Sequence, residues 1–415
     1  MIMDYKKLFH DEVAFQHETL ETRMQNYGFK NMGRMELFLW DLELFLQMQD
    51  RLGDRVVLKG GAATQFYLPK EVHRTSVDID MLFAGTESEI DEVLNQIEAA
   101  ISDGSGLLHF RKHIPKKPKT TLPLFTYYTD IPSVLTAAER NVRDNDTQSQ
   151  ELKVEFITQG EKREYSLVSG EDIFAVHSTK KYQVLPLDSL FADKLTTIGR
   201  NTIGVQDDRM DEQVKQFYDI LMLTRYCRES MNAAEIWNRY KARAEEEWNE
   251  RANSDGEWEV LKAKSFSLDE VIEDVKNQLQ RYEQVDNGED KELKKAINDF
   301  KGLYLNSKVS YAPADVACGA SLVRIMYELL IMGDGWSKIT DLLDTDDLLC
   351  FRELSGIEKG KKVRKVRDML IERFGDDSPI PVKILKGKSL QRVFWSVVTI
   401  ENMDEINVAI EEVAG

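Results

Sequence analysis

The sequence has few cysteines, few histidines and no long apolar run. Its 415 residues include three scattered cysteines without CxxC spacing, which disfavours a disulfide framework or a structural zinc site. The six histidines show no HExxH spacing, and GxSxG and Walker-type motifs are absent, which disfavours histidine-based hydrolysis and P-loop chemistry. No apolar run approaches the roughly 18 residues of a membrane span, and the N-terminus lacks a signal-peptide pattern. We therefore expect a cytoplasmic protein with free thiols and no membrane partner.

Positive charge is also scarce. The chain has 55 lysines and arginines against 73 aspartates and glutamates, a formal net charge of −18, which argues against indiscriminate binding of nucleic acid. Two basic tracts stand out against this background, residues 111–119 and residues 359–367. We keep both as candidate RNA contacts, and the alternative is that each is ordinary solvated surface.

The length favours more than one hydrophobic core, and the periodicity changes along the chain. Residues 11–49 have helical spacing, and the part up to residue 230 then mixes helical spacing with period-two segments, predicted as strands at 56–58, 76–83, 107–111, 124–129 and 152–158. Beyond that point almost every segment has helical spacing. We therefore predict an α+β domain with a mixed sheet, residues 1–230, followed by a mostly α-helical domain, residues 231–415.

The chemistry-bearing candidates begin with two acids on one predicted strand. Asp78 and Asp80 alternate with Val77, Ile79 and Met81, so both carboxylates should lie on the same face of the strand. Two carboxylates at this spacing suit Mg²⁺, or Mn²⁺ in its place, together with substrate phosphates. Glu155 alternates with apolar residues in a later strand and is the predicted third metal ligand, in preference to Glu151. The alternative is that it is a strand glutamate that faces water. A lone Asp-x-Asp is more often a solvated strand face.

A candidate phosphate site precedes these acids. Gly60 and Gly61 lie where a predicted strand gives way to a short helix, so backbone amides and the positive end of the helix could face a triphosphate. Lys59 and Arg74 add positive charge nearby. An isolated Gly-Gly is more often a simple turn. The ordered combination of strand, diglycine, helix and acidic strand is rarer by chance.

These residues resemble a known family, the AbiEii-type nucleotidyltransferases, which are toxins of type IV toxin-antitoxin and phage-abortive systems within the polymerase-β-like superfamily. The resemblance covers about the first 230 residues. Its motifs are Lys59-Gly60-Gly61, Arg74-Thr75-Ser76-Val77-Asp78-Ile79-Asp80, Leu190-Phe191-Ala192-Asp193-Lys194-Leu195 and Lys215-Gln216-Phe217-Tyr218-Asp219-Ile220.

The resemblance implies a polymerase-β-like domain that transfers a nucleoside monophosphate from an NTP and releases pyrophosphate. It implies that Asp78 and Asp80 hold Mg²⁺ and that Lys194 neutralises phosphate charge, while Asp219 positions or deprotonates the acceptor. Lys59, Gly60, Gly61, Arg74 and Ser76 would then line the nucleotide. It further implies an RNA acceptor such as a tRNA 3′ end, and a cognate antitoxin as a partner.

One position departs from the resembled pattern. The last motif of such toxins commonly carries two acids, as Asp-x-x-Asp, but this chain has Gln216 at the first of them. Simpler interpretations also stand: Lys194 could extend to solvent beside an apolar stripe, and Asp219 could pair with Lys215. Two other functions stay open, nucleotidylation of a protein or small molecule, and nucleotide binding without turnover in a regulatory protein.

Overall fold

The computed structural model describes residues 7–102, 107–114, 123–140, 149–253, 261 and 264–414. It divides into two compact units, and the chain passes between them more than once. The first unit comprises Met1–Lys194, Glu246–Phe266 and Phe300–Val309, and the second comprises Leu195–Glu245, Ser267–Asp299 and Ser310–Gly415. The α+β fold class is confirmed. The single boundary after residue 230 stays a prediction, since the compact units follow a different division.

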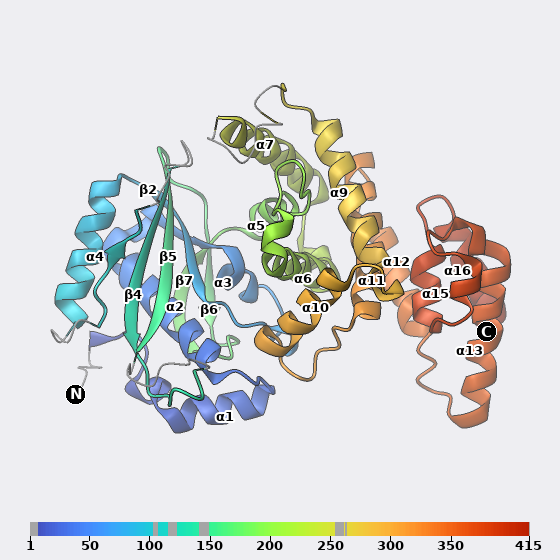
Figure 1. The fold of residues 1–415 in the computed structure, drawn as a ribbon, viewed down its shortest axis with the longest axis horizontal. Helices are drawn as coiled ribbons and strands as arrows, with labels where there is room; N and C mark the ends of the chain where they lie inside the picture. The colour runs from blue at the N-terminus through green and yellow to red at the C-terminus, as the bar shows by residue number, and fades with distance from the viewer. Residues whose placement is uncertain are drawn as a thin grey trace. The chain divides into compact units, whose positions relative to one another are not determined.

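The first unit is built on a seven-stranded mixed sheet with the order β3-β4-β5-β2-β1-β7-β6. The strands β2 and β5, and likewise β1 and β7, run parallel, while the remaining neighbours are antiparallel. Figure 1 shows β4, β5 and β2 side by side. The strands are β1 (Val56–Lys59), β2 (Asp78–Ala84), β3 (Arg111–Lys112), β4 (Leu124–Pro132), β5 (Ser149–Gln159), β6 (Ser166–Gly170) and β7 (Ser178–Val184).

The predicted strands agree with the structure where alternation is strong. The predictions at 56–58, 76–83, 124–129 and 152–158 correspond to β1, β2, β4 and β5, and the prediction at 107–111 is reduced to the two residues of β3. The sequence did not predict β6, which is only five residues long, or β7, whose first half is exposed and polar. The helical stretch 11–49 is in fact two helices, because Gly28 adopts a φ of +76° and ends the first of them.

A long helix, α2, forms the centre of the first unit. It contacts β5, β2, β1 and β7, and most of its side chains are buried, including Phe38 and Phe45. Asn31 caps its start by accepting a hydrogen bond from the Arg34 amide at 3.0 Å. The helices from the N-terminus through this sheet are α1 (His17–Tyr27), α2 (Met32–Leu52), α3 (Gly60–Gln65), α4 (Glu87–Ile101) and α5 (Leu187–Leu195).

The second unit is helical, as the periodicity predicted. Its central helix is α11, which is buried along most of its length and packs against α6, α9 and α15. No helix in the described ranges is long and apolar enough to cross a membrane. The later helices are α6 (Met210–Cys227), α7 (Ala233–Ala252), α9 (Leu268–Glu283), α10 (Lys291–Tyr304), α11 (Pro313–Met332), α12 (Ser337–Leu348), α13 (Gly356–Phe374), α14 (Val382–Leu385), α15 (Leu390–Val397) and α16 (Met403–Ala414).

A buried histidine in the first unit makes its stability sensitive to acid. His73 is fully buried, its Nε2 donates to the carbonyl of Leu68 at 2.9 Å, and burial lowers its pKa to about 4. The unfolded chain binds this proton near the ordinary pKa of 6.5, whereas the folded chain resists it, so stability present above 6.5 is lost as pH falls towards 4. Between pH 7 and 4.5 we expect wild type to lose about 2–3 kcal/mol more than a His73→Gln variant in chemical denaturation. Parallel losses in both proteins would contradict this.

Candidate active site

The two predicted acids lie together on β2. Ile79 and Met81 are fully buried in the core, and Asp78 and Asp80 alternate with them on the opposite face of the strand, where both are half-buried. On the neighbouring strand β5, Lys153 is the Cα partner of Asp78, and Glu155 is the Cα partner of Asp80. The pleat therefore brings Asp78, Asp80 and Glu155 to one face of two adjacent strands.

The diglycine contacts the second acid. Lys59 ends β1 as the Cα partner of Asp80, and α3 begins directly at Gly60, whose φ is +69°. A Cβ on Gly60 would overlap the Asp80 carboxylate and come within 3.0 Å of its Cβ and Cγ. Glycine is therefore required at this position for two reasons, the backbone conformation and the close approach of Asp80.

Arg74 and Ser76 lie on the segment that leads into β2. Arg74 is buried, its guanidinium lies against Gly61 with no room for a Cβ there, and its Nη1 donates to the carbonyl of Thr75 at 2.9 Å. Its backbone amide donates to Gln65 of α3, also at 2.9 Å. Ser76 is buried two residues before Asp78. The structure thus places Arg74 beside the diglycine, as predicted from the sequence.

Negative charge is concentrated around β2. The pKa of Asp80 is raised to about 7, first by burial and then by the carboxylates of Glu155 and Asp78. Asp41 of α2 is buried, and neither of its carboxylate oxygens has a hydrogen-bond partner among the described residues. Burial, followed by the charges of Asp78 and Asp80, raises its pKa well above the ordinary value. A cation placed at these acids would relieve the repulsion between them.

Carboxylate oxygens suit a hard divalent cation, but one of the three carboxylates is already bound to other side chains. Glu155 accepts from Lys153 Nζ at 2.6 Å and from Thr126 Oγ1 at 2.9 Å. Burial opposes the charge on Lys153, but the Glu155 carboxylate outweighs it and raises the pKa of the ammonium group. Within the described ranges, no three His, Cys, Asp or Glu side chains form a ready metal site. Asp78 and Asp80 supply the carboxylate oxygens that Mg²⁺ prefers, whereas Glu155 would have to exchange Lys153 for the metal.

An ion pair connects helix α5 to the residue that precedes the diglycine. Lys59 Nζ lies 3.2 Å from Asp193 Oδ2 in an ion pair between the end of β1 and α5. The following residue, Lys194, is only 3% exposed, so it does not extend to solvent as the simpler interpretation expected. Its predicted role on the phosphates stays a prediction.

Asp219 lies on α6 in the second unit, where it is fully buried. Lys215 forms an ion pair with Glu212 at 2.5 Å, and Gln216 donates to the other oxygen of the same glutamate at 2.8 Å. Gln216, the residue that differs from the family pattern, is therefore hydrogen-bonded to an acid one turn earlier on its own helix. The predicted role of Asp219 towards the acceptor stays a prediction.

The two basic tracts differ in the structure. In the first, Arg111 pairs with Asp130 at 2.5 Å and with Glu151 at 3.1 Å, and Lys112 pairs with Glu87, while residues 115–119 lie outside the described ranges. The described part of this tract is therefore neutralised by acids. The second tract lies on α13.

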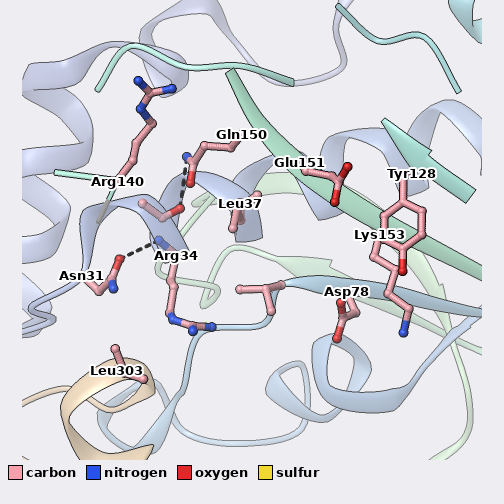
Figure 2. Close-up of a pocket in the computed structure, with 12 residues that line it drawn as sticks. Asn31, Arg34, Leu37, Asp78, Tyr128, Arg140, Gln150, Glu151, Lys153 and Leu303 are labelled. Atoms are coloured by element: carbon pink, nitrogen blue, oxygen red, sulfur yellow. Dashed lines mark hydrogen bonds between the residues drawn. The ribbon is translucent and has the colours of Figure 1, made fainter. Parts of the chain in front are cut away.

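Sequence reasoning missed several residues that line a pocket together with Asp78. Figure 2 shows Arg34, Tyr128 and Lys153 around a pocket that also includes Asp78. Lys153 could have been found, because it shares a strand face with Glu155. Arg34 could not, because only the fold brings the start of α2 to the start of β2.

A mixed sheet that carries paired acids against a diglycine helix start is the arrangement of a nucleotidyltransferase. The model of the family described as nucleotidyl transferase AbiEii toxin, type IV TA system, matches residues 44–306. Because this match spans more than half of the chain, the protein belongs to the AbiEii nucleotidyltransferase toxin family and is a nucleotidyltransferase. The resemblance and the predicted enzyme class are both confirmed.

Two solved structures are similar over much of their length. One is MenT4, a nucleotidyltransferase toxin from Mycobacterium tuberculosis H37Rv, with a TM-score of 0.44, 10% identity, and coverage of 95% of this chain and 98% of that chain. The other is an antigenic nucleotidyltransferase-like protein from Paracoccidioides brasiliensis, with a TM-score of 0.31, 12% identity, and coverage of 58% and 96%. No curated protein sequence matches the chain.

Proposed function

We propose that this enzyme uses Mg²⁺ to transfer a nucleoside monophosphate from an NTP to the 3′ end of an RNA, such as a tRNA, and that it acts as the toxin of a type IV pair. The observation that carries the proposal is the contact between the Asp80 carboxylate and Gly60, with Asp78 on the same strand face. Metal ligands and a phosphate-binding backbone then meet at one place.

Each side chain has a part in the proposed step. Asp78, Asp80 and Glu155 would hold Mg²⁺, or Mn²⁺ in its place, which would stabilise the charge that develops on the phosphates. Lys59, Gly60, Gly61, Arg74 and Ser76 line the triphosphate, and Lys194 balances its charge. The acceptor hydroxyl oxygen bonds to the α-phosphorus and pyrophosphate leaves as the bond to the β-phosphate oxygen breaks. The hydroxyl proton passes to a base, and the family resemblance implies Asp219 for this role.

The transfer is tested by following a label. Purified protein is incubated with each α-labelled NTP, Mg²⁺ and a mixture of total RNA and protein, with an Asp78→Asn/Asp80→Asn double variant as the control. We expect label in RNA, release of pyrophosphate, and neither with the double variant or with EDTA. Label in protein or in a small molecule would show that this molecule, and not RNA, is the acceptor. Mg²⁺-dependent NTP binding without pyrophosphate release in any mixture would indicate a regulatory protein instead.

A basic face on α13 supports an RNA acceptor. Val366 and Leu370 are fully buried on one side of this helix, whereas Lys361, Arg364 and Lys365 are exposed. None of these three cations forms an ion pair within the described residues. Unneutralised cations on one helix face are unusual for a chain of net charge −18 and suit a phosphate backbone.

Reversal of this charge should weaken RNA binding. In a Lys361→Glu/Arg364→Glu/Lys365→Glu variant we expect the affinity for tRNA to fall by about tenfold or more at low salt, with a shallower dependence on salt concentration. Reversing Lys291, Lys294 and Lys295, which are exposed on α10, changes the net charge equally and is the matched control. Equal losses in the two variants, measured by fluorescence anisotropy, would show that only net charge matters.

The antitoxin is tested in cells. We expect induction of the wild-type chain to arrest growth and induction of the Asp78→Asn/Asp80→Asn variant to be tolerated at equal protein level. Co-expression of a cognate antitoxin, sought as the product of a neighbouring reading frame, should restore growth. Arrest by both chains would show that toxicity does not depend on nucleotidyl transfer.

A further inference from the structure

A pocket of about 440 Å³ opens beside Asp78 within the first unit. It is formed by the start of α2, the start of β2, β4, β5 and the segment 300–309, whose Leu303 lines it. Figure 2 shows the Arg34 guanidinium on one side of the Asp78 carboxylate and the Lys153 ammonium on the other. A volume of this size accommodates a nucleotide.

The pocket lies beside Asp78, whereas the diglycine lies beside Asp80. Along β2, Asp80 is the acid that contacts Gly60, whereas Asp78, two residues earlier, is the acid that lines the pocket. Gly60 and Gly61 do not line it. In an in-line displacement the attacking and leaving oxygens are on opposite sides of the phosphorus. If the triphosphate lies at the diglycine beside Asp80, the pocket beside Asp78 is free for the acceptor.

Arg34 is suited to bind an anion in this pocket. Its guanidinium carbon stacks over the ring of Tyr304, 4.0 Å from the centroid, and it forms no ion pair within the described residues. The stacking holds the planar group in one orientation while its hydrogen-bond donors remain available at the edges. Lys153 is less available, because it is paired with Glu155.

Three of the other lining residues suit a base and a sugar. Leu37 and Leu303 supply apolar surface, and the aromatic ring of Tyr128 lines the same wall as Lys153. A ring of this kind can stack on any base, which requires no particular sequence. Arg34 and Arg140 both line the site without an ion pair among the described residues. Together with the aromatic and apolar walls and the Asp78 carboxylate, this positive charge matches one terminal nucleotide with its 5′ phosphate.

We propose that this pocket binds the 3′-terminal nucleotide of the acceptor RNA, with its 5′ phosphate on Arg34, its base against Tyr128 and its terminal hydroxyl beside Asp78. The inference rests on the proposed function and adds the place of the acceptor. Arg34 is here a substrate-binding residue, and its effect should appear in the use of RNA and not in the use of NTP.

The test compares two arginines of the same helix. For Arg34→Gln we expect KM for the acceptor RNA to rise by about tenfold or more, with KM for NTP within about twofold of wild type. Arg34→Lys should recover part of the loss, since it restores charge without the planar fork. Arg51→Gln, at the other end of α2, is the matched control and should behave as wild type.

A second measurement does not depend on catalysis. Without NTP, a fluorescent RNA of about 12 nucleotides with a free 3′ hydroxyl should bind Arg34→Gln more weakly by a similar factor. Thermal unfolding midpoints within about 2 °C of wild type would show that Arg34→Gln is folded. A rise in KM for NTP alone would overturn the proposal and assign the pocket to the incoming nucleotide. Unchanged RNA use in an active Arg34→Gln enzyme would also overturn it. Failure of wild type to label RNA would instead refute the proposed function.

Discussion

Replacing Asp80 by asparagine should lower kcat/KM for nucleotidyl transfer by about 10²–10³-fold or more, without weakening the fold. Asparagine keeps the shape of the side chain but removes the charge that a divalent cation needs. It also removes like-charge repulsion, because the pKa of Asp80 is raised to about 7 by burial and by Glu155 and Asp78. The thermal midpoint in EDTA should therefore be equal to or above that of wild type at pH 8.

Loss of activity without loss of stability in Asp80→Asn would identify Asp80 as a metal ligand and not as a structural residue. A structural acid would lose both together, whereas Asp80→Asn should lose only activity. Asp50→Asn, at an exposed position near the end of α2, gives the same charge change away from the site and should leave activity unchanged. Activity of Asp80→Asn within about fivefold of wild type would be too small a loss for a metal ligand.

Gly60→Ala should abolish most activity through a single added carbon. The new Cβ would overlap the Asp80 carboxylate, so either the acid or the start of α3 must move. The φ of +69° adds a backbone cost of about 1–2 kcal/mol for any other residue. We expect a loss of about 10²-fold or more in kcat/KM, since small displacements of catalytic groups have large effects.

A control at a second glycine distinguishes the effect of backbone strain from the effect of moving Asp80. Gly53 has a φ of +62°, close to that of Gly60, but a Cβ there meets no atom within 4 Å. Gly53→Ala should therefore lower the free energy of unfolding through backbone strain alone, measured by chemical denaturation, with nearly wild-type kinetics. Equal kinetic losses in the two variants would show that the contact between Gly60 and Asp80 has no catalytic importance.

The parts of the site that were predictable from the sequence are local. The alternation in residues 76–83 fixed the common face of Asp78 and Asp80, because the pleat of a strand has a strict period of two. The diglycine was recognisable because a strand and a helix adjoin it. The limits of α4, Glu87–Ile101, are local in the same way, because its apolar spacing and its capping box at Thr86 define them.

The parts that were not predictable depend on contacts between distant segments. The hydrogen bond from Thr126 to Glu155 requires the register of β4 against β5, which no local pattern encodes. Arg34 reaches Tyr304 only through the tertiary fold. The polar strand β7 lacks the alternation that identifies a half-buried strand, although it pairs with β1.

One short contact links the site to a late part of the chain. Arg74 forms an isolated antiparallel bridge with Leu305, and the amide of Thr75 donates to the carbonyl of Tyr304 at 3.1 Å. The backbone partner of the segment that leads into β2 is therefore synthesised more than 200 residues after that segment. At about 5–20 residues per second, translation leaves roughly 10–45 s between the two. During that interval a growing chain on the ribosome carries the acids and the diglycine without this partner, so the catalytic centre is completed only when residue 305 has emerged.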